Sequence, residues 1–256
     1  MSADDVALAR EIAAQAGRLL VSLRSSYGSL DDPEVSRRLR TEADAAAHDH
    51  IAARLAAARP GDALLSEEGA DDDVRLSRAR VWIVDPLDGT WEYGQGRDDF
   101  AVHVALWESG ALVAGALGLP SRDLVLDTAS VPRVADALPT ARPVRIVVSR
   151  SRTPVGIQDV VTRLAVALGR DVEVDTVGSA GAKTAEVIEG RADAYLHDAG
   201  LSEWDVAAPA AVAAAAGLTV CRLDGSPVQY NRRPPLVGDL LVGVPVVASA
   251  LLDVLS

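Results

Sequence analysis

The chain has 256 residues, 49% of them hydrophobic, and 25 basic side chains against 37 acidic ones leave a formal net charge of −12. This apolar content excludes a disordered chain, and the length suffices for one large domain or two closely packed ones. The acidic balance argues against a nucleic-acid polymer as partner, because such binders present a basic face, but it is compatible with small phosphorylated molecules held through metal ions.

The N-terminal region has a helical pattern. Residues 3–24 repeat apolar side chains at a spacing of three and four, which predicts an amphipathic helix. Residues 25–40 are polar, and we expect a loop or short arm there. Thr41 has the character of an N-cap, with Asp44 three residues later as a partner. A second helix is therefore expected from Thr41 to about residue 58.

The remaining chain shows two successive patterns. Short apolar or alternating runs predict strands at 63–65, 81–84, 100–107, 112–119 and 123–127. After a proline-containing connection, strands are expected at 144–149, 171–176, 192–196 and 218–222, alternating with helices at 155–168, 180–189 and 204–216. Such alternation suggests sheet layers covered by helices. The change of pattern divides the chain into an N-terminal part, residues 1–141, and a C-terminal part, residues 142–256.

Two aspartates follow the most apolar of these strands. Asp85 and Asp88 are three residues apart around Pro86, and a turn there would keep its ends within about 7 Å, so that both carboxylates face one point. Leu87 offers a backbone carbonyl between them. Like charges this close repel unless a cation or proton shares them, and hard ions such as Mg²⁺ prefer oxygen ligands. An ordinary surface turn is the alternative, because Asp, Pro and Gly suit turns.

Other polar groups have the same two interpretations. Gly89 and Thr90 supply amides and a hydroxyl beside the aspartates, where a phosphate oxygen could bind. Glu67 follows an expected strand, and Asp205 lies in the first turn of an expected helix, where the helix dipole favours negative charge. A solvated loop and an N-cap are the alternatives for these two acids. The residues alone leave open whether they converge.

Basic side chains in the C-terminal part are candidates for binding an anion. Lys183 is the only lysine beside 24 arginines, and it follows Gly178 at an expected helix start, a place suited to an anion. Arg150 and Arg152 follow an expected strand and could hold a second phosphate through their planar guanidinium groups. The alternatives are a solvent-facing lysine and a loop made soluble by charge.

Three motifs, in this order, resemble the signatures of the inositol monophosphatase superfamily of Mg²⁺-dependent, lithium-sensitive phosphatases. They are Glu67-Glu68, Asp85-Pro-Leu-Asp-Gly-Thr90 and Trp204-Asp205-x-x-Ala-Pro209. Within the superfamily the chain is most similar to the 3′(2′),5′-bisphosphate nucleotidases of the CysQ type, whose central motif continues Asp-Gly-Thr-x-Glu-aromatic, as Thr90-Trp-Glu-Tyr93 does. Further similarity lies at 97–100, 149–151, 178–183 and 230–231.

The resemblance implies a layered αβαβα sandwich of the α+β or α/β class and a role for each matched position. It implies that two or three Mg²⁺ ions are held by Glu67, Asp85, the Leu87 carbonyl, Asp88 and Asp205. Asp44 and Thr90 would activate a water molecule. The implied substrate contacts are Gly89, Thr90, Ser149, Arg150, Gly178, Ser179, Lys183 and Tyr230. Tyr230 would stack on a base or else cap the core.

The chain departs from the nucleotidase pattern at two positions near these motifs. Arg152 stands where the pattern usually has a histidine, and Trp91 replaces a more usual lysine. Residues 25–43 also contain no lysine and little of the family's usual arm, which bears on a third metal ion. The sequence leaves the roles of Arg152 and Trp91 open.

The activity that the resemblance implies is removal of the 3′-phosphate of adenosine 3′,5′-bisphosphate, and of its 5′-phosphosulfate relative, in connection with sulfate assimilation. The alternatives on the same metal core are inositol monophosphate and fructose 1,6-bisphosphate as substrates. A metal-binding module without turnover is the alternative of another class, but the implied ligands and the water-activating pair are all present. The family suggests a monomer or homodimer.

The sequence also bears on location. The chain starts with an acidic segment, unlike a secretory signal. Its most apolar stretch, residues 206–221, contains Pro209 and Gly217 and falls short of the ~20 apolar residues of a membrane span. Cys221 is the only cysteine, which excludes an intramolecular disulfide. We therefore expect a cytoplasmic protein without membrane attachment.

Overall fold

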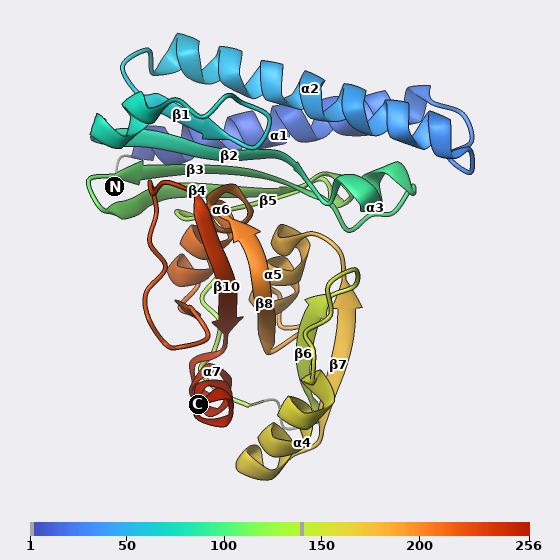
Figure 1. The fold of residues 1–256 in the computed structure, drawn as a ribbon, viewed down its shortest axis with the longest axis vertical. Coiled ribbons are helices and arrows are strands. Elements are labelled where there is room, and N and C mark those ends of the chain that lie inside the picture. The colour runs from blue at the N-terminus through green and yellow to red at the C-terminus, as the bar shows by residue number, and fades with distance from the viewer. Residues whose placement is uncertain (1–2, 139–140) are drawn as a thin grey trace.

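The computed structural model describes residues 3–138 and 141–256, in which layers of helices and sheets alternate (Figure 1). Helices α1 (Ala3–Ser26) and α2 (Pro33–Ala58) form the first layer. The first sheet follows, with β1 (Ala63–Ser66), β2 (Arg80–Asp88), β3 (Ala101–Glu108), β4 (Ala111–Leu119) and β5 (Leu124–Asp127). Between the two sheets lie α5 (Ala180–Ile188) and α6 (Glu203–Ala215).

The second sheet and two outer helices complete the arrangement. This sheet contains β6 (Val144–Ser149), β7 (Val172–Val177), β8 (Ala194–Ser202), β9 (Thr219–Cys221) and β10 (Leu236–Gly243), and it is followed by α4 (Ile157–Leu168) and α7 (Pro245–Leu255). Three short helices lie between strands: η1 (Asp73–Ser77), α3 (Thr90–Gly94) and η2 (Pro120–Arg122). The expected αβαβα sandwich is confirmed.

Both sheets are mixed. The first has the order β1-β2-β3-β4-β5, in which only β1 and β2 run parallel. The second has the order β7-β6-β8-β10-β9, in which β6 runs parallel to both of its neighbours. Because β1 and β2 are parallel neighbours, their carboxyl ends lie at the same edge of the first sheet. Glu67, which follows β1, is thereby brought close to Asp85 and Asp88 near the end of β2.

Residues 81–84 of β2 form a continuous apolar run because the strand is covered on both faces. Trp82 and Val84 pack in the cluster formed with α1 and α2, whereas Val81 and Ile83 pack against Ala207 and Ala208 of α6. A strand buried in this way has a continuous apolar run instead of an alternating one. The apolar stretch before Asp85 therefore indicates a strand that is buried on both faces.

The start of α2 differs from the expectation. The helix begins at Pro33 and not at Thr41; Asp32 is its N-cap and accepts a hydrogen bond from the amide of Glu34. Aspartate at the N-cap and proline at the first helical position are both typical of a helix start. The predicted loop was wrong because the first turns of α2 are mostly exposed and therefore polar. Thr41 lies inside the helix, where its hydroxyl donates to the carbonyl of Arg37.

The last 34 residues, 223–256, carried no predicted element, yet they contain β10 and α7. Strand β10 lies inside the second sheet between β8 and β9, and its pairing with β8 is irregular near Gly238. Two glycines and Asp239 interrupt its apolar pattern, which explains why it was not recognised. The other predicted helices and strands are confirmed, with shifts at their ends. The largest shift is at the end of β8, which was expected to end at residue 196 and continues to Ser202.

The most apolar stretch of the chain forms α6 and β9. Val206–Ala213 are buried because α6 lies between the two sheets, and Cys221 is buried in β9. Within residues 3–138 and 141–256, no helix combines the length and the apolar character needed to cross a membrane.

Candidate active site

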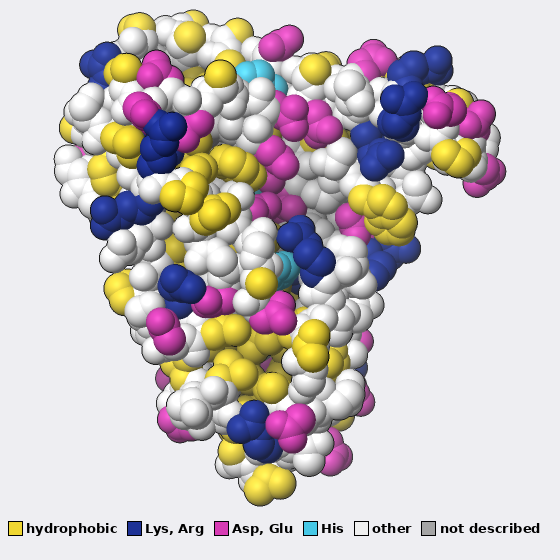
Figure 2. All heavy atoms as spheres, viewed as in Figure 1, with side chains coloured by type: hydrophobic (Ala, Val, Ile, Leu, Met, Phe, Trp, Pro, Cys, Tyr) yellow, Lys and Arg dark blue, Asp and Glu magenta, His cyan; other side chains and the backbone are white. Residues whose placement is uncertain are grey.

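A pocket of about 210 Å³ opens beside the carboxyl end of β2. Its walls come from the start of α3, the loop after β6, the start of α5, the end of β8 and the first turn of α6. Figure 2 shows acidic side chains gathered in the hollow between the upper and lower parts of the molecule, with a basic side chain and a histidine just below them. Both halves of the chain therefore contribute to this pocket.

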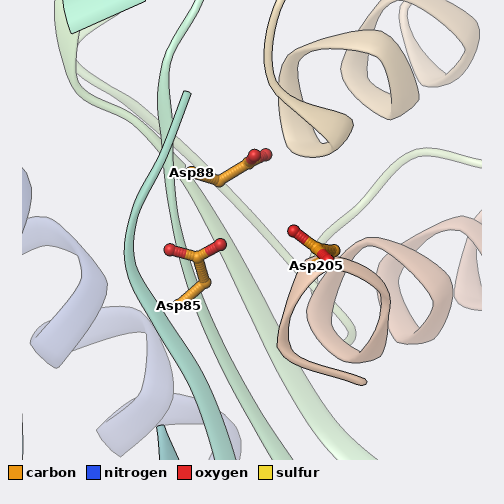
Figure 3. Close-up of side chains that lie close together, drawn as sticks. All are labelled: Asp85, Asp88 and Asp205. Atoms are coloured by element: carbon orange, nitrogen blue, oxygen red, sulfur yellow. The ribbon is translucent and has the colours of Figure 1, made fainter. Parts of the chain in front are cut away.

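Three aspartates meet in the pocket. Asp85 and Asp88 come from β2 and Asp205 from the start of α6, and one oxygen of each lies within 4.8 Å of the others (Figure 3). Residues three apart on a regular strand would point to opposite faces. Here the pairing with β3 shifts between Asp85 and Asp88, and such a bulge re-aims side chains. The two carboxylates face one point as expected, but through a bulged strand end instead of the expected turn around Pro86, and the alternative of an ordinary surface turn is wrong.

Asp205 is held within the first turn of α6. One of its carboxylate oxygens accepts a hydrogen bond from the amide of Ser202 at 2.6 Å, as part of a capping box. Burial, followed by the charge of Asp88, raises the pKa of Asp205 to about 6. Asp205 is thus not the N-cap of α6, which is Ser202, but the third residue of the helix, and its carboxylate takes part both in the capping box and in the acidic cluster.

Glu67 follows β1 and lies at the exposed rim of the same pocket. Desolvation and the nearby charges of Asp205 and Asp88 raise its pKa to about 7. Burial, followed by the charges of Glu67, Asp88 and Asp205, raises the pKa of Asp85 well above its ordinary value. Without a cation, these carboxyl groups cannot all be ionised at neutral pH at low cost.

Asp88 is the exception, because three donors surround one of its oxygens. Oδ2 accepts hydrogen bonds from Ser179 Oγ at 2.5 Å and from the amide of Gly181 at 2.8 Å, and His103 Nε2 lies 3.2 Å away. Burial alone would raise the pKa of Asp88, but the nearby cationic form of His103, together with Lys183 and the Ser179 hydroxyl, lowers it to about 2. Asp88 is therefore ionised and fixed in orientation.

The acidic cluster has the donor set of a hard divalent cation. Its side chains offer only carboxylate oxygens, without thiolate or imidazole ligands, and Mg²⁺ prefers such oxygens. A divalent cation would also offset the repulsion that raises the pKa of Glu67, Asp85 and Asp205. The Leu87 carbonyl lies in the same pocket and accepts the Thr90 hydroxyl at 2.9 Å.

Asp44 reaches the pocket edge from α2. Its Oδ1 lies 3.4 Å from the hydroxyl of Thr90, and burial, followed by the charge of Glu68, raises its pKa to about 7. A carboxyl group with a pKa near the operating pH can accept and return a proton, which is the requirement for a general base. The pair that the resemblance implied is therefore in contact.

Six of the expected substrate contacts line the pocket, namely Gly89, Thr90, Ser149, Gly178, Ser179 and Lys183. Several of their polar groups are already bound within the protein. The amide of Gly178 donates to Asp99 at 2.7 Å, and Gly178 must be glycine, because a Cβ there would lie 2.4 Å from Glu92. Gly89 has a φ of 88°, which glycine adopts without strain.

Lys183 holds the turn before α5. Its Nζ donates to the carbonyls of Gly178 at 2.6 Å and Ser179 at 2.8 Å, and it lies 5.0 Å from the ring of Tyr195. Burial lowers its pKa to about 8. Because this turn carries the groups that bind Asp88, Lys183 positions that carboxylate.

Arg150 and Tyr230 lie outside the pocket lining. Arg150 pairs with Glu92 at 3.1 Å and Asp99 at 2.6 Å, so its guanidinium joins the two halves of the chain and is neutralised there. Tyr230 lines a separate cavity between β4, α6 and β9. We therefore do not include these two residues among the proposed substrate contacts.

The pocket also contains Arg152, for which the sequence offered a second phosphate as one possible partner, and residues to which the sequence assigned no role. Trp91, Arg152, Tyr195 and His197 line it, and His103 lies behind Asp88. Arg152 forms no ion pair with any described carboxylate, and its guanidinium contacts only the carbonyl of Gly200 at 3.3 Å. The departures of Trp91 and Arg152 from the nucleotidase pattern were the available signal. No sequence signal placed His103 or His197 here.

Comparisons with known proteins show the family to which the chain is related. A family model described as "Inositol monophosphatase family" matches residues 3–252. The chain is 42% identical to a 3′-phosphoadenosine 5′-phosphate phosphatase of Mycobacterium leprae, over 98% of this chain and 93% of that protein. It is 33% identical to the 3′(2′),5′-bisphosphate nucleotidase CysQ of Escherichia coli, over 75% and 80% of the two chains.

A solved structure shares the whole arrangement. The crystal structure of CysQ from Bacteroides thetaiotaomicron has a TM-score of 0.79 and 28% identity, covering 94% of this chain and 97% of that one. Sequence match and fold thus extend over the same two halves that form the pocket. The chain belongs to the inositol monophosphatase family.

Proposed function

We propose that this protein is a Mg²⁺-dependent phosphatase that removes the 3′-phosphate of adenosine 3′,5′-bisphosphate. The observation that carries the proposal is a pocket lined both by the acidic cluster and by Arg152, which forms no ion pair with a carboxylate of the described residues. The relation to phosphatases named for this substrate supports it. Adenosine 3′-phosphate 5′-phosphosulfate carries the same 3′-phosphate, and we propose it as a second substrate.

Glu67, Asp85, Asp88, Asp205 and the Leu87 carbonyl would hold the metal ions. Mg²⁺ held there would supply Lewis acidity, which neutralises phosphate charge and makes water more acidic. The chain's own residues then position and deprotonate the attacking water. The Thr90 hydroxyl lies between the Leu87 carbonyl and Asp44, so it can orient the water while Asp44 takes up a proton.

Arg152 favours a substrate with two phosphates. It is exposed and belongs to the pocket lining. Burial lowers the pKa of both Lys183 and His197, and the charge of Arg152 adds to this effect, so the three side chains share one corner of the pocket. A planar guanidinium binds phosphate oxygens in pairs. With one phosphate at the acidic cluster, a second anionic group would reach this corner.

A substrate panel tests the proposal. With saturating Mg²⁺, we expect the highest kcat/KM for adenosine 3′,5′-bisphosphate, a lower value for inositol 1-phosphate and fructose 1,6-bisphosphate, and no phosphate release in a chelator. Lithium ions are expected to inhibit. A higher kcat/KM for inositol 1-phosphate would contradict the choice of substrate, and the absence of turnover on every member would contradict enzymatic function.

The variant Arg152→Ala sharpens this panel. We expect kcat/KM for adenosine 3′,5′-bisphosphate to fall about 10- to 100-fold, because a charge-assisted hydrogen bond contributes roughly 1.5–3 kcal/mol. The loss should be much smaller for inositol 1-phosphate, which has no second phosphate. Arg145→Ala, on the adjoining strand β6 and paired with Glu173, is the matched control. Equal losses on both substrates would contradict a role for Arg152 in selection.

Metal removal should make stability depend on pH. The folded-state pKa of Asp205, about 6, lies above its unfolded value. The folded protein therefore binds more protons, and in a chelator its stability should decrease as pH rises from about 4 to 7. We expect a loss of about 2 kcal/mol, or about 5 °C in Tm, by differential scanning calorimetry. Mg²⁺ or Asp205→Asn should flatten this dependence. An unchanged slope in both cases would indicate general charge repulsion instead.

A further inference from the structure

Trp91 exposes an indole ring in the pocket. It is 51% exposed and belongs to the pocket lining, whereas Trp82 is buried and Trp107 and Trp204 pack in an apolar cluster. Among the described residues, Trp91 is also the one aromatic side chain with a large exposed surface. A large aromatic surface left in water at a binding pocket is available to a ligand.

The backbone that carries Trp91 is held firmly on both sides. Thr90 donates its hydroxyl to the Leu87 carbonyl, and Glu92 is buried and paired with Arg150. Tyr93 is buried, and its hydroxyl donates to the carbonyl of Leu20 at 2.8 Å. The residue itself has no ring–ring or cation–π contact within the described part of the chain. Helix α3 therefore presents an exposed indole ring from a firmly held backbone.

The other aromatic rings of the pocket cannot serve in the same way. Tyr195 is fully buried, and its ring lies under the ammonium group of Lys183. His197 is 2% exposed, and its two ring nitrogens contact Tyr195 and the carbonyl of Ala199. Tyr230, which the sequence placed either on a base or over the core, lines a separate cavity and packs against the core.

We propose that Trp91 stacks on the purine base of the substrate and so selects nucleotides over phosphorylated sugars and inositols. This inference rests on the proposed function and adds a specificity-determining residue to it. Trp91 directly follows Thr90, beside the acidic cluster, so a nucleotide with its 3′-phosphate there would have its base near this edge of the pocket. Stacking of a base on an aromatic side chain corresponds to roughly 10-fold in affinity or more.

Tryptophan fluorescence tests the contact without turnover. Adenosine 5′-phosphate should quench the emission of the wild-type protein in Mg²⁺, and ribose 5-phosphate, which lacks a base, should not. Trp91→Phe should remove this quenching, whereas Trp107→Phe, which removes a tryptophan near the other end of β3, should retain it. Quenching that persists in Trp91→Phe would overturn the proposal.

Kinetics provide the second test. In Trp91→Ala, the ratio of kcat/KM for adenosine 3′,5′-bisphosphate to that for inositol 1-phosphate should fall about 10-fold, mostly through KM for the nucleotide. Trp91→Phe should restore most of this ratio, because phenylalanine keeps an aromatic face. A ratio within about twofold of wild type in Trp91→Ala would overturn the inference and leave the proposed phosphatase intact. If wild type fails to hydrolyse the nucleotide, the proposed function fails, and the fluorescence result decides the role of Trp91 by itself.

Discussion

Replacing Asp88 by asparagine should reduce kcat on adenosine 3′,5′-bisphosphate by more than about 10⁴-fold at saturating Mg²⁺, which is more than the loss of a general base alone. The physical reason is the central place of this carboxylate, which lies within 4.8 Å of the other two aspartates and has the lowest pKa of the cluster. An asparagine keeps an oxygen for Ser179 Oγ and the Gly181 amide but removes the negative charge. The fold should therefore remain while Mg²⁺ affinity, measured by calorimetry, is lost.

The control for Asp88→Asn is the same change at Asp98, an exposed acid outside the pocket lining. Asp98→Asn should retain Mg²⁺ binding and kcat. Circular dichroism and Tm would show that Asp88→Asn is folded. A kcat close to wild type in this variant at saturating Mg²⁺ would refute the metal-ligand role of Asp88.

Replacing Asp44 by asparagine should lower kcat by about 10²–10⁴-fold while Mg²⁺ affinity and KM change little. Asp44 contacts Thr90 and lies outside the cluster of three aspartates, so its loss removes proton transfer and leaves the metal ligands in place. Thr90→Val, which removes the hydroxyl that would orient the water, should have an effect of the same order. Loss of Mg²⁺ affinity in Asp44→Asn would contradict this division of roles.

The pH profile provides a further check on Asp44. Its pKa is raised to about 7, and only its ionised form can accept a proton. Activity should therefore decrease as pH falls below this value, or below a lower value where bound cations favour the ionised form. The residual activity of Asp44→Asn should lack this acidic limb. An identical limb in wild type and variant would assign it to another group.

Local pattern was sufficient for most of the secondary structure. The apolar periodicity of residues 3–24 predicted α1, and the run before Asp85 predicted β2, because burial imposes these patterns directly on the sequence. The prediction of helices and strands failed where the apolar pattern was weak. The first turns of α2 are polar because they are exposed, and β10 is interrupted by glycine and aspartate.

The identity of the acids was likewise available from the sequence, through their motifs. Their convergence was not, because it depends on three separate events in the fold. Strands β1 and β2 pair in parallel, a bulge re-aims Asp85 and Asp88, and α6 places its N-terminus against the first sheet. Each event joins segments that are distant in the sequence, and no local pattern encodes it.

By itself, the sequence determined the layer order, the family and the residues with the chemistry to bind a cation. The tertiary structure decided which of the similar side chains are free to act. Arg150 and Arg152 are indistinguishable as neighbours in a loop, but the first is neutralised by Glu92 and Asp99 and the second faces the pocket. Trp91 is exposed there, whereas Tyr230 lies in another cavity. The reason is that charge pairing and exposure are properties of the surroundings, which long-range contacts create.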